Sequence, residues 1–221
     1  DVISESDDRG LEHLDRHLRE DFQVKLSTVI GPGHETECLS FLNRTIRYHP
    51  GKGYSWLPNP RHALEVAEEL GLASAKPVAA PSVKDGGSAL AQSQDLLDAA
   101  GVAVFMRCVG KLIYLSSDRY DIQYAVRGLA QDLKTPTQLS LLRLKHLAKY
   151  LLGTLGWCLE YGWQGVQSRV LGYSDSDWAT CTTTRRSVSS ILVLHGNHFL
   201  TGAVSGQSVV ALSSGEAEYY A

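Results

Sequence analysis

The sequence predicts an α+β fold, because helical and strand patterns occupy separate stretches of the chain. Residues 95–154 carry apolar residues at helical spacing, with an interruption near residues 116–121 and a helix after Pro136 that ends at Gly153. Residues 169–212 show strand patterns instead, which favours an antiparallel meander with strands at 169–177, 189–200 and 208–214. Segregated helices and antiparallel strands are typical of the α+β class.

The first 75 residues predict two helices and a strand pair. Apolar residues recur at every third or fourth position from 9 to 22, which indicates an amphipathic helix that Ser6 or Asp7 could cap. Residues 37–58 predict two strands joined by the turn HPGKG. Residues 60–72 predict a short helix that ends at Gly71. We expect its inward side chains to be Leu64, Ala67 and Leu70.

Two stretches mark expected boundaries along the chain. Residues 76–94 are rich in Pro, Gly and Ser, which predicts a surface linker. Residues 153–165 mark a second change, from the helical to the strand pattern. The last residues, EAEYYA, predict the first turn of a further helix.

Composition excludes several classes of protein. The chain has 221 residues, of which 43% are hydrophobic and 20% charged, as in ordinary globular proteins. No apolar run approaches about 18 residues, so we expect no membrane span. The start, DVISESDDRG, lacks an apolar core, so we expect no signal peptide and no secretion. It also lacks a first Met, which suggests a fragment, and the four cysteines form no CxxC pair.

Positive charge gathers in the middle of the chain. Residues 101–160 hold eight Lys and Arg against four Asp and Glu, between two acidic flanks. Within the predicted helix 139–152, Arg143, Lys145 and Lys149 make a basic surface, to which His146 adds. Such a surface can contact a phosphate backbone without reading its sequence. A solvated helix face is the alternative interpretation.

Acidic residues suggest a metal site. Asp175 and Asp177 alternate along a predicted strand, so their side chains share one face. Glu216 and Glu218 follow about 40 residues later, at the predicted helix start. A strand acid facing a helix-start acid could bind Mg²⁺, which prefers a few carboxylates with water and phosphate. Exposed acids at a strand end are the alternative.

The two histidine pairs are weaker indications of a functional site. His13 and His17 lie four residues apart, but HLDRH lacks the glutamate of the HExxH zinc motif. We therefore interpret them as part of a solvated helix face. His195 and His198 belong to HGNH, which we interpret as a turn between strands.

Six ordered stretches resemble the Pol polyprotein of copia-type retrotransposons. FLNRTIRYHPGKGY is similar to the family's FLGxxIxY, and ELGLASAKPVAAP to FGMxxxKPVxTP. FMRCVGKLIYLSSDRYDIQYAV resembles YRxxVGxLxYLxxxTRPDIxYAV, and PTQLSLLRLKHLAKYLLGT resembles PTxxHxxAxKRxLRYLKGT. GYSDSDWATCTTTRRSVSS resembles GYSDADWAGxxxxRRSTSG, and SVVALSSGEAEYYA resembles TVALSSTEAEYxA.

The resemblance implies three regions. Residues 1–90 would be the end of the reverse transcriptase palm, with Asp1 as the second Asp of its YxDD turn. Residues 91–160 would be the helical thumb or connection, and residues 165–221 the front half of a ribonuclease H-like domain. The partners would be template–primer or an RNA–DNA hybrid and the rest of Pol. The location would be cytoplasmic, in virus-like particles, or nuclear.

The resemblance also assigns residues. Asp175 and Glu218 match the family's catalytic and metal-binding carboxylates, which use Mg²⁺ and accept Mn²⁺. Arg143, Lys145 and Lys149 would contact nucleic acid. The family's later carboxylates lie beyond Ala221, so we expect the chain as given to be inactive.

Several positions depart from the family pattern. Asn43 replaces a Gly, Ser140 a His and Leu152 a Lys, and we expect the last two changes to weaken the nucleic-acid-facing helix. Gly215 replaces a Thr, which we expect to weaken a helix start that Ser214 could cap instead.

Two alternatives remain. The chain could be a non-catalytic nucleic-acid-binding remnant that uses helix 139–152, or a decayed product without function. We also expect poor stability or aggregation, because the meander would leave one apolar face and its strand edges uncovered.

Overall fold

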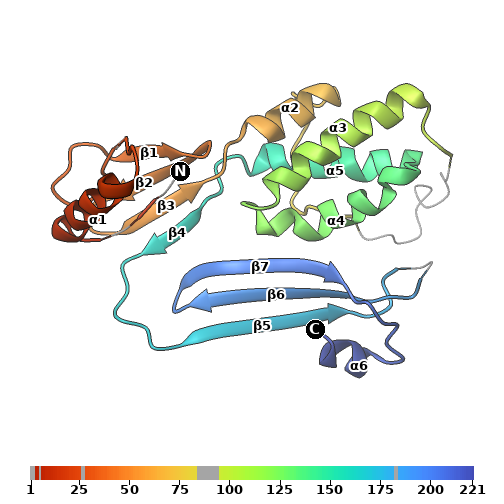
Figure 1. Cartoon of the computed structure of the whole chain (residues 1–221). Helices are drawn as coiled ribbons and strands as arrows, with labels where there is room; N and C mark the ends of the chain where they lie inside the picture. The colour runs from red at the N-terminus through yellow and green to blue at the C-terminus, as the bar shows by residue number, and fades with distance from the viewer. Residues whose placement is uncertain (1–2, 5, 26–27, 84–94, 182–183) are drawn as a thin grey trace. The chain divides into compact units, whose positions relative to one another are not determined.

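The computed structural model describes residues 3–4, 6–25, 28–83, 95–181 and 184–221. Asp1 and residues 84–94 of the expected linker lie outside the described residues. Contacts divide the chain into two compact units, Asp1–Leu57 with Cys158–Trp163, and Pro58–Trp157 with Gln164–Ala221. Figure 1 labels the elements of both units, which are described separately below.

The first unit contains a four-stranded antiparallel sheet with the order β1-β2-β3-β4. Its strands are β1 (Cys38–Phe41), β2 (Arg44–His49), β3 (Gly53–Leu57) and β4 (Leu159–Gly162). The predicted HPGKG turn is confirmed between β2 and β3, but residues 37–58 form three strands rather than the predicted two, because the chain turns once more between β1 and β2. Gly53 is required beside β4, because a Cβ there would overlap the carbonyl oxygen of Tyr161.

A two-residue hairpin turn joins β1 to β2. Its central residues, Leu42 and Asn43, both have positive φ values, of 49° and 64°. Two-residue hairpins favour such turns because their twist matches that of the strands. Asn adopts this conformation more readily than most residues, so Asn43 is a good substitute for the family's Gly.

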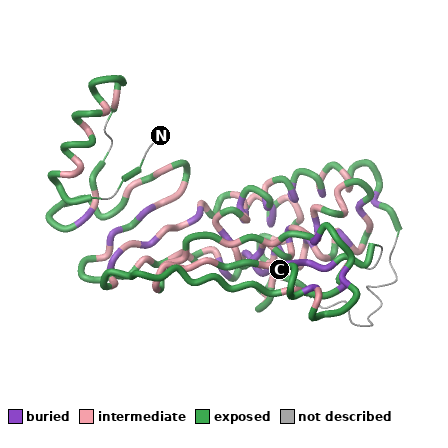
Figure 2. Tube along the Cα trace, turned by 60° about the horizontal axis from the view of Figure 1, so that its bottom comes forward, coloured by how far each residue is buried: buried purple, intermediate pink, exposed green. Residues whose placement is uncertain are grey.

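Helix α1 (Asp8–Asp21) confirms the first predicted helix and its cap. The Asp7 carboxylate accepts a hydrogen bond from the backbone N–H of Gly10 at 2.8 Å. None of its residues is buried, as the green and pink tube in Figure 2 shows. Its apolar stripe is therefore not part of a described core, and Phe22, just past its end, is 66% exposed.

The second unit contains a helical core. Its helices are α2 (Arg61–Glu69), α3 (Ala99–Leu115), the short 3₁₀ turns η2 (Tyr120–Ile122) and η3 (Asp132–Lys134), α4 (Gln123–Gln131) and α5 (Gln138–Gly153). The interruption near residues 116–121 and the helix end at Gly153 are confirmed. The largest fully buried side chains come from α2, α3, η2 and α5: Val66, Phe105, Cys108, Val109, Leu112, Ile122, Leu144, Leu147 and Leu151.

Helix α2 corrects one prediction about orientation. Leu64 is 40% exposed, whereas Ala63, Val66 and Ala67 are buried. The predicted end is confirmed: Gly71 has a φ of 68°, and the N–H of Leu72 donates to the carbonyl of Ala67 at 2.7 Å. A glycine in this left-handed conformation satisfies the last carbonyls of a helix.

A three-stranded antiparallel meander follows, with the order β5-β6-β7. Its elements are β5 (Val170–Asp177), β6 (Val188–His195), β7 (His198–Gly206) and the helix α6 (Ser214–Tyr219). The meander, the HGNH turn and the final helix are confirmed. The predicted strand at 189–200 is divided by the HGNH turn between β6 and β7. The predicted strand at 208–214 was wrong, because residues 207–213 lie outside the strands and Ser214 begins α6.

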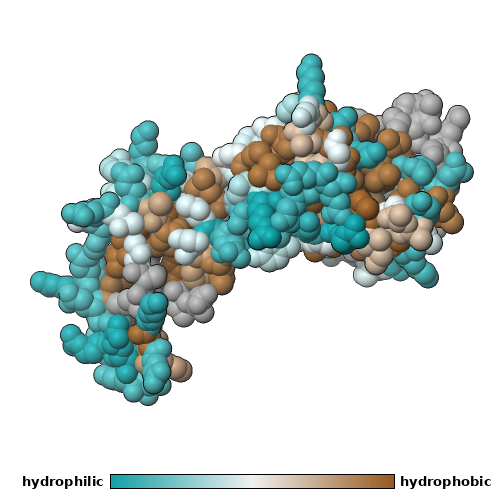
Figure 3. Space-filling view, turned by 90° about the horizontal axis from the view of Figure 1, so that it is seen from above, coloured by the Kyte–Doolittle hydropathy of each residue, from teal (hydrophilic) through white to brown (hydrophobic). Residues whose placement is uncertain are grey.

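Apolar side chains remain at the surface of the second unit. On the face that Figure 3 shows, brown areas interrupt the hydrophilic surface. The exposed apolar residues of α2 and α3 are Leu64, Met106, Ile113 and Tyr114. In the described part of the chain, no helix has the length and apolar character needed to span a membrane.

Candidate functional site

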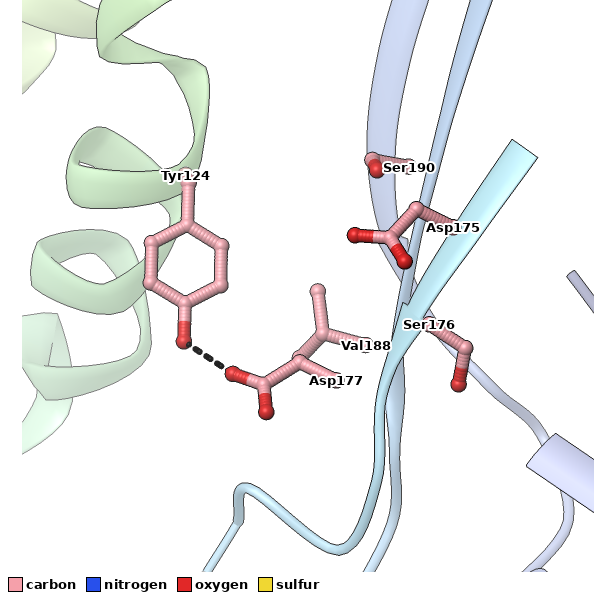
Figure 4. A pocket seen from close by; sticks show the side chains of 6 residues that line it. All are labelled: Tyr124, Asp175, Ser176, Asp177, Val188 and Ser190. Atoms are coloured by element: carbon pink, nitrogen blue, oxygen red, sulfur yellow. Dashed lines mark hydrogen bonds between the residues drawn. The ribbon is translucent and has the colours of Figure 1, made fainter. Parts of the chain in front are cut away.

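The acid pair lines a pocket beside the meander. Asp175 and Asp177 are paired with Ser190 and Val188 of β6, so all four side chains share one face of the sheet. The pocket measures about 280 Å³ and is lined by Tyr124, Asp175, Ser176, Asp177, Val188 and Ser190. Figure 4 shows both carboxylates on the side that faces Tyr124, while Ser176 points the other way. The predicted common face of the two acids is confirmed.

The two carboxylates have different environments. The Tyr124 hydroxyl donates a hydrogen bond to Oδ2 of Asp177 at 2.9 Å. Burial, and then this bond, raises the pKa of Tyr124 above its ordinary value. Among the residues that the structure describes, none hydrogen-bonds or ion-pairs with Asp175. Asp175 is thus the more available carboxylate of the pair.

A stripe on α4 and the preceding turn packs against this face of the sheet. The Tyr120 and Phe199 rings lie 4.0 Å apart between centroids. The Arg127 guanidinium lies over Gly206, where a Cβ would collide with it. Tyr120, Tyr124 and Arg127 are spaced by four and three residues, so they share one side of the helix. Two contacts, one on each side of Tyr124 along the chain, therefore hold it over the pocket.

The predicted helix-start acids occupy α6. The Gln207 side chain fixes this helix, because its Nε2 donates to Ser189 Oγ at 2.9 Å and to the Ala217 carbonyl at 2.7 Å. Glu216 accepts a hydrogen bond from the backbone N–H of Leu212 at 2.7 Å. Glu218 is exposed, and neither glutamate lines the pocket. The pairing of Asp175 with Glu218 stays a prediction.

The cap of α6 differs from the expectation. Ser213 caps the helix and accepts a hydrogen bond from the Glu216 N–H at 3.1 Å. The expected substitute cap, Ser214, is the first helical residue instead. Gly215 lies inside the first turn, so replacing Thr there removes no cap.

The pocket offers donors suited to a hard divalent cation. Mg²⁺ is commonly bound by one or two carboxylates, with water and substrate phosphate completing its shell. Asp175 and Asp177 supply two carboxylates to this pocket. Within the described ranges, no group of three or more His, Cys, Asp or Glu residues could hold a metal.

The basic residues of α5 are partly engaged. Arg143 pairs with Asp132 at 3.8 Å, and His146 Nε2 lies 2.9 Å from the Ala80 carbonyl. Lys145 and Lys149 are half-buried, and in the described part of the chain neither has an ion-pair partner. The two lysines are therefore the residues of this helix most available to a phosphate.

Ser140 faces the protein rather than a ligand. It is 2% exposed, and its hydroxyl donates to Asp132 Oδ2 at 2.7 Å. It also completes a reciprocal cap with Thr137 at the start of α5. Ser140 is therefore a buried capping residue, and the expectation that the His-to-Ser change weakens a nucleic-acid-facing helix stays a prediction.

Sequence reasoning missed a buried polar network. Arg119 is 6% exposed and binds the Asp121 carboxylate through two nitrogen–oxygen contacts of 2.8 and 2.7 Å. It also donates to the carbonyl and hydroxyl of Thr154, at 2.9 and 2.7 Å. The Tyr150 hydroxyl donates to Asp121 at 2.8 Å, and the Trp157 ring lies 5.6 Å from the guanidinium carbon.

This network explains two stretches of the family pattern. Arg119 and Asp121 stand at the Arg and Asp of TRPD, whereas Tyr150 and Thr154 stand at the Tyr and Thr of YLKGT. Burial alone would raise the pKa of Asp121, but the bonds to Arg119 outweigh it and hold the value low. Burial and Asp121 raise the pKa of Tyr150 to about 12. The signal available in the sequence was that these four residues match the family's TRPD and YLKGT stretches.

Several known proteins are similar in sequence to this chain. An uncharacterized mitochondrial protein of Arabidopsis thaliana, AtMg00810, is 31% identical over 194 residues, covering 87% of this chain and 75% of the relative. The retrovirus-related Pol polyprotein from transposon RE1 of the same plant is 32% identical over 163 residues, or 74% of this chain. The corresponding polyprotein from transposon TNT 1-94 of Nicotiana tabacum is 31% identical over 174 residues, or 75% of this chain.

The chain spans 11% of the RE1 polyprotein and 13% of the TNT 1-94 polyprotein. No protein-family model matches the sequence. No solved structure matches it either. The named relatives cover most of the chain at above 30% identity, and the six sequence resemblances point to the same group. The chain therefore belongs to the Pol polyprotein family of copia-type retrotransposons.

Proposed function

We propose that the chain is part of a retrotransposon polymerase that acts on RNA–DNA hybrids, with residues 165–221 as the front half of its ribonuclease H-like domain. The observation that carries the proposal is the acid pair Asp175 and Asp177 beside the pocket on β5. Family membership supports the proposal, because the relatives are Pol polyproteins. Residues 1–90 would then be the end of the polymerase palm and residues 91–160 the thumb or connection.

Each acidic residue would have a role in cleavage of the RNA strand. Asp175 and Asp177 would hold Mg²⁺ or Mn²⁺, and Glu218 would contribute once α6 and the hybrid are in place. The bound ion would supply charge neutralisation at the cleaved phosphodiester. Asp175, which lacks a hydrogen-bond partner among the described residues, would be the first ligand.

An RNA-strand cleavage assay on an RNA–DNA hybrid tests this function. The assay would use the 221-residue chain and a chain extended past Ala221 by the element's own sequence, with Mg²⁺ and then Mn²⁺. Cleavage by either chain that is lost in Asp175→Asn and Glu218→Gln, but kept in the matched control Glu12→Gln on α1, supports the proposal. Cleavage that survives Asp175→Asn, or its absence from both chains, contradicts it.

A second candidate is nucleic-acid binding without catalysis. The favouring observation is that Lys145 and Lys149 have no ion-pair partner among the described residues. Unpaired lysines on one helix can neutralise phosphates and release counterions. This binding would also serve the first candidate, since a template–primer must be held before it is cut.

A further inference from the structure

We propose that Tyr124 is a positioning residue for the acid pair: its hydroxyl orients Asp177 so that this carboxylate and Asp175 both face the pocket. The inference rests on the proposed function, because it assigns Tyr124 to the cation site of that function. Figure 4 shows the Tyr124 hydroxyl directed at the nearer oxygen of Asp177.

The acid pair needs a donor of this kind. Two carboxylates at alternate positions of one strand face repel one another when both are ionised. A phenol that donates to one of them favours its charged form and fixes its rotamer. Because the bond at 2.9 Å uses Oδ2 of Asp177, the other oxygen, Oδ1, remains available to a cation.

Tyr124 is itself held from both sides. The ring contact between Tyr120 and Phe199 lies one turn before it, and Arg127 over Gly206 lies one turn after it. The Tyr124 hydroxyl is therefore positioned by a helix that packs on the sheet through other contacts. A donor fixed in this way orients an acid better than one on a free surface side chain, because less rotamer entropy is lost.

Residues that orient metal ligands have measurable effects on affinity. Loss of such a partner commonly lowers metal affinity by 10–100-fold. Asp177 is exposed, so its carboxylate can turn toward solvent once the hydroxyl is gone. We therefore expect Tyr124→Phe to lower the affinity of the pocket for Mn²⁺ by about tenfold, the lower end of that range.

The test measures Mn²⁺ binding, which is monitored through the electron paramagnetic resonance signal of the free ion. The proteins would be the full chain, Tyr124→Phe, Asp177→Asn and the double variant. If Tyr124 acts through Asp177, the double variant binds Mn²⁺ as Asp177→Asn does, with no further loss. The matched control is Tyr173→Phe, because Tyr173 lies on the same face of β5 two residues before Asp175 and is 55% exposed. It should bind Mn²⁺ like the unchanged chain.

The outcomes distinguish a failure of this inference from a failure of the proposed function on which it rests. Unchanged affinity in Tyr124→Phe, or an equal loss when Asp177 is already Asn, overturns the role of Tyr124 and leaves the proposed function standing. If the unchanged chain does not bind Mn²⁺, or binds it equally well as Asp175→Asn, the cation site itself is wrong and both proposals fall. A thermal melt of each variant without Mn²⁺ shows whether a loss of affinity reflects a loss of folding.

Discussion

Arg119 binds both carboxylate oxygens of Asp121, at 2.8 and 2.7 Å, while the same guanidinium bonds Thr154 just after the end of α5. The ion pair thus ties the turn before α4 to the helix end some 35 residues later. A buried charge needs both a partner and satisfied hydrogen bonds, and this arrangement supplies them.

Removal of Asp121 should therefore destabilise the second unit strongly. Asp121→Ala leaves a guanidinium that is 6% exposed without its counter-charge, at a cost of about 3 kcal/mol in the free energy of unfolding. Urea unfolding followed by circular dichroism would measure this cost. Arg61→Ala, which breaks the exposed pair with Glu65, is the control and should change little. A loss in Asp121→Ala no larger than in the control would show that the network is dispensable.

The same network predicts how stability depends on pH. The pKa of Asp121 is lowered in the folded chain, so its contribution is present above about pH 4 and is lost as the pH falls further. The pKa of Tyr150 is raised to about 12, so its contribution is present below about pH 10 and is lost as the pH rises toward 12. Unfolding free energies from pH 3 to 11 would test both limbs. Asp121→Asn should reduce the loss of unfolding free energy at low pH, and Tyr150→Phe should reduce the loss at high pH. Variants whose stability changes with pH in the same way as that of the unchanged chain would count against the network.

The hairpin between β1 and β2 offers a backbone test. Asn43 has a φ of 64°, so Asn43→Val should destabilise the first unit by about 1–2 kcal/mol, because a β-branched residue is strained there. Asn43→Gly should be close to neutral, since glycine adopts positive φ freely. Thermal melts of both variants would measure the difference. Equal stability of the Val and Gly variants would mean that the turn relaxes to another conformation.

Ser140→Ala should weaken the start of α5. The substitution removes one half of the reciprocal cap with Thr137 and a hydrogen bond to Asp132, at a cost of about 1–2 kcal/mol. Chemical denaturation would measure the cost. Ser116→Ala, which removes a hydroxyl bond to the Ile113 carbonyl at the end of α3, is a matched Ser→Ala change that leaves every helix start unchanged. A smaller effect at Ser140 than at Ser116 would contradict the prediction.

Binding to an RNA–DNA hybrid should depend on Lys145 and Lys149. If both contact phosphates, affinity falls steeply as salt rises, and each Lys→Ala change lowers the slope of log affinity against log salt by about 1. Fluorescence anisotropy at several salt concentrations would measure the slope. Lys76→Ala, an exposed lysine before α5, is the control. Affinity that is indifferent to salt would exclude phosphate contacts by this helix.

The sequence predicted most of the local structure of the second unit. Helical spacing, the break at residues 116–121 and the stop at Gly153 depend on neighbours along the chain, so pattern reading sufficed. The third predicted strand was wrong. SVVALSS has a strand composition, but residues 198–206 already pair with β6 in its place. Strand β4 was missed for a related reason: its partner β3 lies about a hundred residues away, and short strands give weak patterns.

The candidate site was predicted only in part. The common face of Asp175 and Asp177 follows from the period of a strand. The contribution of Tyr124 could not be predicted, because nothing in its sequence neighbourhood indicates that α4 packs against the meander. The Arg119 network was hidden in the same way, since its members are joined by folding rather than by spacing.

The pairing of Trp56 on β3 with Leu159 on β4 has a topological consequence. Residues 57–158 between them leave the sheet from one strand and return to it in the neighbouring strand, so the two ends of this segment are adjacent. Closing so long a loop from an unfolded chain is entropically costly, whereas a prefolded helical core reduces the number of free residues to be closed. The fourth strand should accordingly be the last to join its sheet during refolding.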